Sequence, residues 1–437
     1  MITILIPEKI PAHNKGEEAI LKGMLKTLEF IPEKKIYLVS KSPAYDKSQY
    51  KESVEIIENC LVPDPSDGIF KKIIHISKVV PSHIIYLISY KISKNLTKKL
   101  FNKGIWKIYN EVDIVLAAHD NAYSKMHNYM ILFCKMIDKF TAIYGASIRS
   151  FLYKGILNRY ITKYCLNIAD LVTVREEVTQ NILVKNLGIN KDVIKLTADL
   201  AFLMDPLDKV SSIKLLEKYD IYYEKEPIIG MTIVNKTGIL NQIKINIKNH
   251  INKLSQLVEF VSEKTMAKIV FFPHSIGPEE ADDDRIAAQA IFDICRNKDN
   301  IILIEDDIPA AELKGMIGCC DFFIGERTHS IISAVSMLVP SVSISHRHDY
   351  RTIGILGKML EMEKLIYDVN EIDNIEKLKD FVLNAWNNRE FIKNSLIRTV
   401  PNAINNAMKN EIYLKDALSF KKILGPKDRV NCTHPYI

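Results

Sequence analysis

The sequence predicts an α/β protein made of two doubly wound domains, over about residues 1–205 and 206–400, with a C-terminal helical tail over 401–437. The first observation behind this is that strand-like and helix-like hydrophobic patterns alternate through both halves of the chain, which indicates parallel βα units. The second is length, because 437 residues suffice for two to three domains of about 100–200 residues each. The third is composition, since 47% hydrophobic and 26% charged residues are typical of folded proteins and exclude global disorder.

The first half of the chain supplies alternating elements in the order that a parallel sheet requires. Residues 2–6 form a mostly apolar run, which is typical of a strand buried on both faces. From Gly16 onward, apolar residues recur at the spacing of a helix. Later strands are expected at 35–40, 113–121, 140–148 and 171–174, and a further helix over 176–188.

The second half repeats this alternation. Strands are expected at 227–234, 267–275, 300–306, 321–325 and 340–345, and helices over 241–264, 283–296, 308–320 and 330–338. In open α/β sheets, ligands bind beyond the carboxyl ends of the strands. Functional side chains are therefore expected in the loops that follow strands, at 11–17, 118–124, 145–150, 175–177, 199–203, 273–279, 325–330 and 345–351.

Charge and cysteine content exclude several classes of protein. The net charge of +6 over 437 residues is mild, so nucleic acid is not expected as a partner. The seven cysteines form no CxxC pair, which favours neither a disulfide framework nor a structural zinc site and fits a reducing cytosol. The N-terminal apolar run is too short for a signal peptide, and no window of about 18 apolar residues predicts a membrane span. A cytoplasmic protein is therefore expected.

One segment, residues 71–110, interrupts the alternation. It contains nine lysines and no acidic residue, with apolar residues interleaved. One interpretation is a solvated helical excursion in which Ile84, Leu87 and Ile88 pack on the body of the protein. A second is an interfacial patch that contacts an anionic membrane, at the inner face of the cell membrane. A third is a patch for an anionic polymer or a lipid-linked pyrophosphate.

The richest string of functional residue types runs from Asp321 to Ser330, DFFIGERTHS. A strand delivers Glu326, Arg327 and His329 to the carboxyl edge of the sheet, and Ser330 is expected to open the next helix. A guanidinium, an imidazole and a helix N-terminus suit an anionic substrate together with proton transfer. The alternative is that Arg327 pairs with a local carboxylate and that His329 caps a loop.

A second polar string, SHRHDYRTIG, follows the strand at 340–345. In it Arg347 and Arg351 could hold a phosphate or carboxylate, or the string could be a solvated turn whose charges pair among themselves. His346 and His348 have the spacing of a metal-binding pair, but no third ligand follows at a sequence spacing that is typical of a metal site. No metal site is therefore predicted.

Three further loops carry candidate residues. His274 is placed at a strand tip, and Asn14 and Gly16 open the first helix as a ligand-facing turn would. Arg175 stands between a strand and a helix. The acidic pair at 283–284 could serve the site or could start a helix, where negative charge is favoured.

Taken in order, these strings resemble the polysaccharide pyruvyl transferase family. The resemblance covers roughly residues 10 to 360. The matching strings are Asn14-x-Gly16-Glu17, VTVRE at 172–176, DLAF at 199–202, Pro273-His274, Asp283-Asp284, CDFFIGERTH at 320–329, SMLVP at 336–340, and Arg351 with Gly354. The Arg-x-His pair in a strand–loop–helix setting is the most specific of them.

This resemblance implies a GT-B-like fold, in which two Rossmann-like domains face each other across a cleft, with the acceptor on the N-terminal and the donor on the C-terminal domain. It also implies transfer of pyruvyl from phosphoenolpyruvate to two hydroxyls of a sugar, which gives a pyruvate ketal and phosphate. The sugar would belong to a cell-surface polysaccharide or its lipid-linked precursor. Phosphoenolpyruvate would be a co-substrate, and no cofactor is expected.

The resemblance and the loop positions together predict the site residues. His329 is expected to be the catalytic acid/base. The donor is expected to contact Arg175, Arg327, Arg351, Glu326 and Ser330. The acceptor is expected to contact Asn14, Gly16, Glu17, His119, Asp120 and Asn121. Further candidates are His274, His346 and His348. Arg351 stands where the family commonly has Lys, and a guanidinium can hold an anion bidentately.

Two other functions stay open from the residues alone. One is a nucleotide-sugar-dependent glycosyltransferase of the same fold in envelope glycan synthesis, which would bind a diphosphate through the same arginines. The other is a non-catalytic glycan-binding subunit of an envelope assembly. The acceptor sugar, the linkage and the oligomeric state are not predicted.

Overall fold

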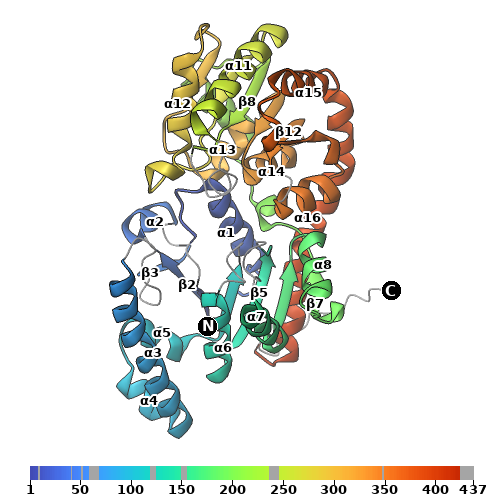
Figure 1. The fold of residues 1–437 in the computed structure, drawn as a ribbon. Coiled ribbons are helices and arrows are strands. Elements are labelled where there is room, and N and C mark those ends of the chain that lie inside the picture. Colours follow the sequence, from blue (N-terminus) through green and yellow to red (C-terminus); the bar gives the residue numbers. More distant parts are fainter. Residues whose placement is uncertain are drawn as a thin grey trace.

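A computed structural model describes residues 1–7, 10–40, 42–50, 53–58, 68–118, 125–148, 155–235, 246–346 and 349–423. The molecule has two lobes, each built on one parallel sheet flanked by helices (Figure 1). The predicted fold class, two doubly wound α/β domains, is confirmed.

The N-terminal sheet has the strand order β3-β2-β1-β4-β5-β6-β7, and all of its pairs are parallel. Its strands are β1 (Ile2–Ile6), β2 (Lys34–Ser40), β3 (Glu55–Glu58), β4 (Ile114–Ala118), β5 (Phe140–Ala146), β6 (Leu171–Val174) and β7 (Ile194–Leu196). The direction of strand addition reverses between β1 and β4. Ligands of such sheets bind at this switch point, beyond the carboxyl ends of the strands.

Apolar side chains cover both faces of this sheet, which explains why β1 has no alternation of polar and apolar residues. Ile4 packs toward α1 (Lys15–Thr27), while Leu5 packs on the other face with Tyr86 and Phe133. The remaining helices of this half are α2 (Pro43–Tyr50), α3 (Ile69–Ile92), α4 (Lys94–Leu100), α5 (Gly104–Glu111), α6 (Lys125–Met136), α7 (Ile156–Ile168), α8 (Glu177–Lys185), and the short η1 (Lys191–Val193) and η2 (Leu200–Leu203).

The C-terminal sheet repeats the same topology, with the order β10-β9-β8-β11-β12-β13 and its switch point between β8 and β11. Its strands are β8 (Ile228–Thr232), β9 (Lys268–Phe271), β10 (Ile301–Leu303), β11 (Phe322–Gly325), β12 (Ser341–Ser345) and β13 (Ile366–Asp368). Its helices are α9 (Lys209–Glu217), α11 (Ile247–Thr265), η3 (Glu280–Asp282), α12 (Asp284–Ile294), α13 (Ala310–Ile317), α14 (Thr328–Ser336), the π-helix η4 (Thr352–Met359), η5 (Glu363–Leu365), η6 (Val369–Glu371) and α15 (Ile375–Asn387).

The helix α16 (Arg389–Phe420) connects the two lobes, running from the C-terminal domain down along the N-terminal one (Figure 1). Its buried Asn410 accepts hydrogen bonds from Thr173 Oγ1 at 2.6 Å and Thr197 Oγ1 at 3.2 Å. The predicted division at residue 400 thus falls inside one helix, because α16 starts as the last helix of one domain and ends as a covering helix of the other.

The lysine-rich segment forms α3, α4 and α5, which project from the N-terminal domain (Figure 1). Helix α3, with 24 residues, is long and apolar enough to cross a membrane by length and composition. The expectation of no such segment was wrong, because between residues 73 and 90 the only charged residue is Lys78. One interpretation of this segment packs Ile84, Leu87 and Ile88 on the body. Leu87 is partly buried against the domain, whereas Ile84 and Ile88 are exposed.

Candidate active site

The two switch points meet where the N-terminus of α1 faces the N-terminus of α14. The backbone N–H of Lys15 donates to the carbonyl of His274 at 2.9 Å, and that of Ile276 donates to the carbonyl of His13 at 3.0 Å. At Gly16 a Cβ atom would lie 2.5 Å from His329 Cβ, so only glycine allows this approach. The loops after β1 and β9 and the start of α14 thus form one interface between the domains.

His329 lies in the first turn of α14 and is 9% exposed. Its Nε2 atom stands 3.4 Å from Oδ2 of Asp199, which belongs to the N-terminal domain and caps η2. This distance is longer than an ordinary hydrogen bond, but it places an imidazole beside a carboxylate across the domain interface. The geometry suits a histidine that exchanges protons while a carboxylate holds its ring.

Helix α14 begins at Thr328, two residues earlier than predicted, so Ser330 does not open it. The Ser330 hydroxyl donates to the carbonyl of Arg327 at 2.9 Å, and the residue is fully buried. Its side chain is therefore occupied in closing the first turn of the helix.

Arg175 holds Asp199 from the far side. Its Nη1 donates to Asp199 Oδ2 at 2.8 Å and its Nε to Ser147 Oγ at 2.8 Å, and both Arg175 and Asp199 are fully buried. Burial by itself would raise the pKa of Asp199, but the charges of Arg175 and His329 outweigh it and lower that pKa. Asp199 is therefore an ionised carboxylate that Arg175 and His329 share.

Arg327 pairs with Asp284, as the alternative interpretation of its sequence string expects. Its Nε donates to Oδ2 of Asp284 at 2.8 Å and its Nη2 to Oδ1 at 2.6 Å. Oδ2 also accepts the backbone N–H groups of His274 and Ser275, each at 3.0 Å. Asp284 therefore fixes both the guanidinium and the loop after β9, while the Arg327 side chain keeps 15% of its surface exposed.

His274 is buried behind this pair, and neither of its ring nitrogens has a hydrogen-bond partner among the described residues. Burial is the main cause that lowers its pKa well below the ordinary value, and the positive charges of His329, Arg327 and Lys15 act in the same direction. His274 is thus a neutral imidazole.

Glu326 makes its contacts within the C-terminal domain. One carboxylate oxygen accepts the backbone N–H of Val234 at 2.9 Å, and the other lies 2.7 Å from Nε2 of His250. These partners belong to the end of β8 and to α11, so the structure does not bring Glu326 together with His329.

Arg351 stands just before η4 and is 20% exposed. Its Nε donates to Asp349 Oδ1 at 3.0 Å and its Nη2 to Asp349 Oδ2 at 2.9 Å. Three residues further along the chain, a Cβ on Gly354 would lie 2.5 Å from Oε2 of Glu176, the residue after Arg175. Burial raises the pKa of Glu176. The segment after β12 thus reaches the loop after β6, on the same interface as His329.

On the acceptor side, Asn14 caps α1 by accepting the backbone N–H groups of Gly16 at 3.0 Å and Glu17 at 3.2 Å. This cap turns the N-terminus of α1 toward α14.

The predicted residues His119, Asp120, Asn121 and His348 lie outside the described residues. His346 is described, and its carbonyl accepts the backbone N–H of Asp349 at 2.8 Å.

Sequence reasoning placed Asp199 in the matching string at 199–202 and Lys15 in the loop at 11–17, but it assigned neither residue a role at the site. Lys15 is 1% exposed, and its Nζ lies 2.6 Å from Oδ1 of Asp307 across the interface. The signal for Asp199 was its position inside the apolar string ADLAFL, because a charge surrounded by core residues needs a buried partner. No comparable signal pointed to Lys15.

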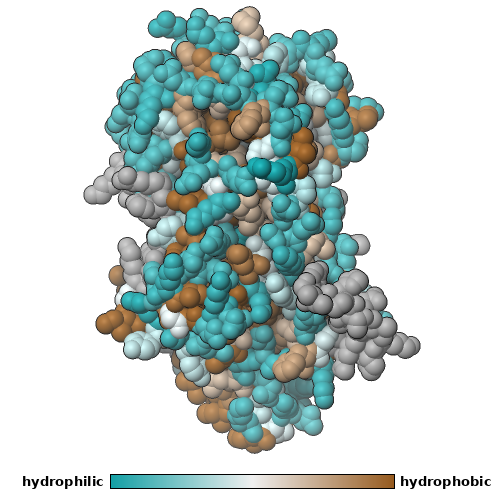
Figure 2. All heavy atoms as spheres, turned by 90° about the vertical axis from the view of Figure 1, so that its right-hand side faces the viewer, coloured by the Kyte–Doolittle hydropathy of each residue, from teal (hydrophilic) through white to brown (hydrophobic). Residues whose placement is uncertain are grey.

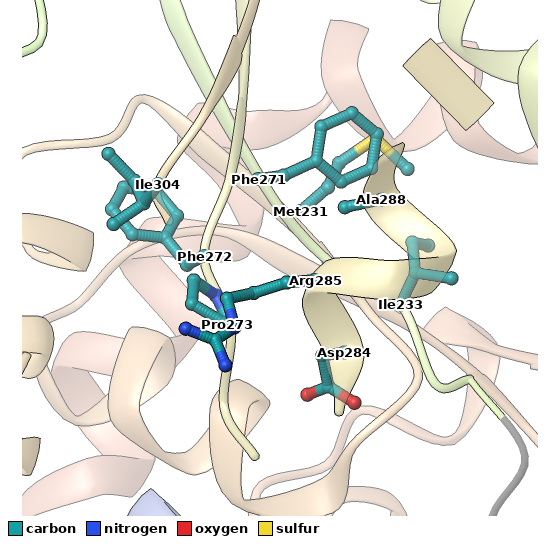
Figure 3. A pocket seen from close by; sticks show the side chains of 9 residues that line it. All are labelled: Met231, Ile233, Phe271, Phe272, Pro273, Asp284, Arg285, Ala288 and Ile304. Carbon is teal, nitrogen blue, oxygen red and sulfur yellow. The ribbon is translucent and has the colours of Figure 1, made fainter. Parts of the chain in front are cut away.

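A small, mainly apolar pocket adjoins the site on the C-terminal side (Figure 3). Its lining comes from β8, β9, α12 and the loops after β8, β9 and β10. It consists of Met231, Ile233, Phe271, Phe272, Pro273, Asp284, Arg285, Ala288 and Ile304. Asp284, the partner of Arg327, is the residue that this pocket shares with the interface.

Among the described residues, no group of three or more His, Cys, Asp or Glu is arranged to hold a metal ion.

Solved structures with the same architecture include a UDP-GlcNAc 2-epimerase and a glycosyltransferase. The UDP-GlcNAc 2-epimerase of Neisseria meningitidis bound to UDP-GlcNAc has a TM-score of 0.59 at 13% identity, over 96% of this chain and all of that one. The S. aureus MnaA–UDP structure has a TM-score of 0.60 at 13% identity, over 97% and 98%. A glycosyltransferase from Rickettsia africae has a TM-score of 0.52 at 17% identity, over 95% and 98%. These likenesses confirm the GT-B-like fold.

Sequence comparison addresses the family. The amylovoran biosynthesis protein AmsJ of Erwinia amylovora is 25% identical over 135 residues, which are 28% of this chain and 32% of that protein. The family model of polysaccharide pyruvyl transferases matches residues 14–348, about three quarters of the chain, and this range contains Asn14, Arg175, Asp199 and His329. The chain therefore belongs to the polysaccharide pyruvyl transferase family.

Proposed function

We propose that this protein transfers pyruvyl from phosphoenolpyruvate to two hydroxyls of one sugar, in a cell-surface polysaccharide or its lipid-linked precursor. The observation that carries the proposal is the His329–Asp199 pair, which joins the two domains between the N-termini of α1 and α14. Family membership supports the same chemistry.

The reaction needs one proton donor and two nucleophilic hydroxyls. The methylene carbon of phosphoenolpyruvate takes a proton while the first sugar oxygen bonds to C2. The second sugar oxygen then bonds to C2 as the bond from C2 to the phosphate oxygen breaks. The two hydroxyl protons balance the proton on the new methyl group and the one left with phosphate or solvent. We assign the proton transfers to His329, and such catalysis contributes about 10²–10⁴-fold.

Asp199 and Arg175 act as positioning residues in this proposal. Asp199 is ionised and faces His329, so it can orient the ring when Nε2 carries a proton. Arg175 was predicted to bind the donor, but it is fully buried behind Asp199. We therefore assign it to holding Asp199 in place.

The donor's carboxylate and phosphate need cations and N–H donors on the C-terminal side. We assign these to Arg327, Arg351 and the N-terminus of α14, where the helix dipole favours an anion. Both guanidiniums are partly exposed and each is paired with an aspartate. A bound donor would have to join or replace those pairs, which makes binding sensitive to Asp349 and Asp284.

The acceptor sugar is assigned to the N-terminal domain, next to Asn14, Gly16 and Glu17 at the start of α1. This places its hydroxyls opposite the donor across the interface. His119, Asp120 and Asn121 stay predictions from the sequence.

A nucleotide-sugar-dependent glycosyltransferase is the second candidate, because the similar structures include a glycosyltransferase and enzymes bound to UDP or UDP-GlcNAc. Thermal-shift measurements separate the two. We expect phosphoenolpyruvate to raise the melting temperature, and UDP- and CDP-sugars to leave it unchanged, since a ligand that binds only the folded state stabilises it. The opposite pattern would support the glycosyltransferase.

A further inference from the structure

Helix α3 presents an apolar face that no described residue covers. It attaches to the N-terminal domain through His83 and Tyr86, whose rings pack on Phe133 at centroid distances of 4.5 and 5.8 Å. On the outer side, the exposed aliphatic side chains include Ile84 at 51%, Ile88 at 55% and Ile92 at 72%. The first turns of the helix continue this surface with Ile69, Phe70, Ile73 and Ile76, all exposed.

Helix α7 adds a second exposed stripe to the same face of the sheet, because α3 and α7 both pack on α6. Leu157 is 72% exposed, and Tyr160 and Tyr164 are 71% and 57% exposed at helical spacing. The tyrosine side chain has an apolar ring and a polar hydroxyl, and tyrosines are enriched at membrane–water boundaries for this reason. In Figure 2 hydrophobic atoms gather at the lower end of the molecule, at the height of α4 in Figure 1.

The charged residues of the segment 69–110 all have one sign. Residues 69–110 contain nine lysines and no acidic residue. Of these, Lys78, Lys91, Lys98, Lys99 and Lys103 are exposed. Lys94 is also exposed, but it pairs with Asp138 at 3.1 Å. An apolar stripe with lysines beside it matches the boundary of an anionic bilayer, where acyl chains lie under negative headgroups.

The positive charge of this surface also favours an anionic bilayer over a second copy of the chain as its binding partner. A symmetric dimer through α3 would bring the same lysines of both copies together, and like charges at an interface oppose association. The aromatic contacts of His83 and Tyr86 hold α3 along the side of the domain, which favours a helix lying in the membrane surface over one crossing the bilayer.

We infer that α3, α4 and α7 form a membrane-docking surface that binds anionic lipid bilayers peripherally. The isoleucines of α3 enter the boundary between headgroups and acyl chains, and the lysines contact lipid phosphates. The inference is independent of the proposed reaction.

Vesicle flotation with the full chain tests it. We expect the protein to bind phosphatidylglycerol vesicles at low salt. Binding should be much weaker at about 1 M salt, where charges are screened beyond about 3 Å. We expect no binding to phosphatidylcholine vesicles. Changing Lys91, Lys98, Lys99 and Lys103 to Gln should lower the affinity roughly 10²–10³-fold, at about fivefold for each lysine that contacts lipid. Changing Ile84 and Ile88 to Ser should weaken binding without removing its salt dependence.

The matched control changes Lys214, Lys218, Lys225 and Lys264 to Gln, four exposed lysines of the C-terminal domain. It alters net charge equally and should leave binding intact. Failure to float with phosphatidylglycerol at low salt overturns the inference. So does equal loss in both lysine variants, binding to both lipids that resists salt, or a dimer in light scattering that Ile84→Ser and Ile88→Ser dissolve.

Discussion

At the scale of single residues, the carboxylates decide what the predicted cations do. Arg175, Arg327 and Arg351 each follow a strand, which made them visible in the sequence. The partners of Arg175 and Arg327, Asp199 and Asp284, lie far from them in the chain, and spacing alone could not pair them. Arg351 differs, because its partner Asp349 is two residues away. The sequence thus indicated which residues line the interface, but not which of them face the substrates.

Asp199→Asn tests the buried pair. Because Arg175 would keep a buried charge and lose its carboxylate, we expect the free energy of unfolding to fall by about 3–5 kcal/mol. Turnover should fall as well, since the ring of His329 loses its ionised neighbour. Urea denaturation and steady-state kinetics measure both effects. Asp192→Asn, an exposed carboxylate on the preceding turn, is the control and should change neither.

The pH dependence follows from the lowered pKa of Asp199. A carboxyl whose pKa is lower in the folded protein stabilises it fully above the unfolded pKa of about 3.9 and less as pH falls toward the folded value. The wild type should therefore lose more stability than Asp199→Asn between neutral pH and acid below about pH 4. Equal acid sensitivity of the two proteins would argue against an ionised Asp199.

Gly16→Ala tests the contact between α1 and α14. A Cβ there would lie 2.5 Å from His329 Cβ, so the helices must move apart, at a cost of about 1–3 kcal/mol. We expect lower turnover and a lower melting temperature. Gly68→Ala is the control, because a Cβ at Gly68 meets nothing within 4 Å. An alanine variant with wild-type turnover would mean that this approach does not matter for catalysis.

At the scale of elements, the central strands were predictable, and so was the edge strand β10, which lies within the expected strand at 300–306, but the edge strands β3 and β13 were not. β1 and β6 lie at their predicted residues, because strands buried on both faces are continuous apolar runs. β3 and β13 were missed. β3 is a four-residue edge strand with a glutamate at each end, and β13 has three residues. Short, charged edges protect a sheet from pairing with other chains, and they leave little pattern to detect.

Helix α3 shows a different limit at this scale. Its hydrophobic composition could be read from the sequence, but which of its side chains pack on the domain could not. His83 and Tyr86 form the buried face, so Ile84 and Ile88, which one interpretation of the segment packed on the domain, are exposed. The lysine-rich character of the segment was visible from the start, and the structure adds the apolar face beside it.

At the scale of the whole molecule, the two lobes repeat one topology, and their switch points meet at His329 and Gly16. Parallel sheets and their order follow from alternating elements. The way in which one lobe packs on the other does not follow from this alternation. It depends on pairs such as Lys15 with Asp307, which no local pattern in the sequence predicts. The proposed reaction depends on this closure, since the donor and acceptor residues belong to different lobes.

The fate of the bridging oxygen of phosphoenolpyruvate tests the central proposal most directly. The protein would be incubated with phosphoenolpyruvate labelled with oxygen-18 between C2 and phosphorus, and with a panel of hexose and N-acetylhexosamine oligosaccharides. Ketal formation breaks the bond from C2 to oxygen, so we predict labelled phosphate, released only with an acceptor, together with a pyruvate ketal on the sugar. His329→Ala should slow this release by about 10²–10⁴-fold, and His75→Ala, on α3, should not. Acceptor-independent release, label retained on pyruvate, or full activity of His329→Ala would contradict the account.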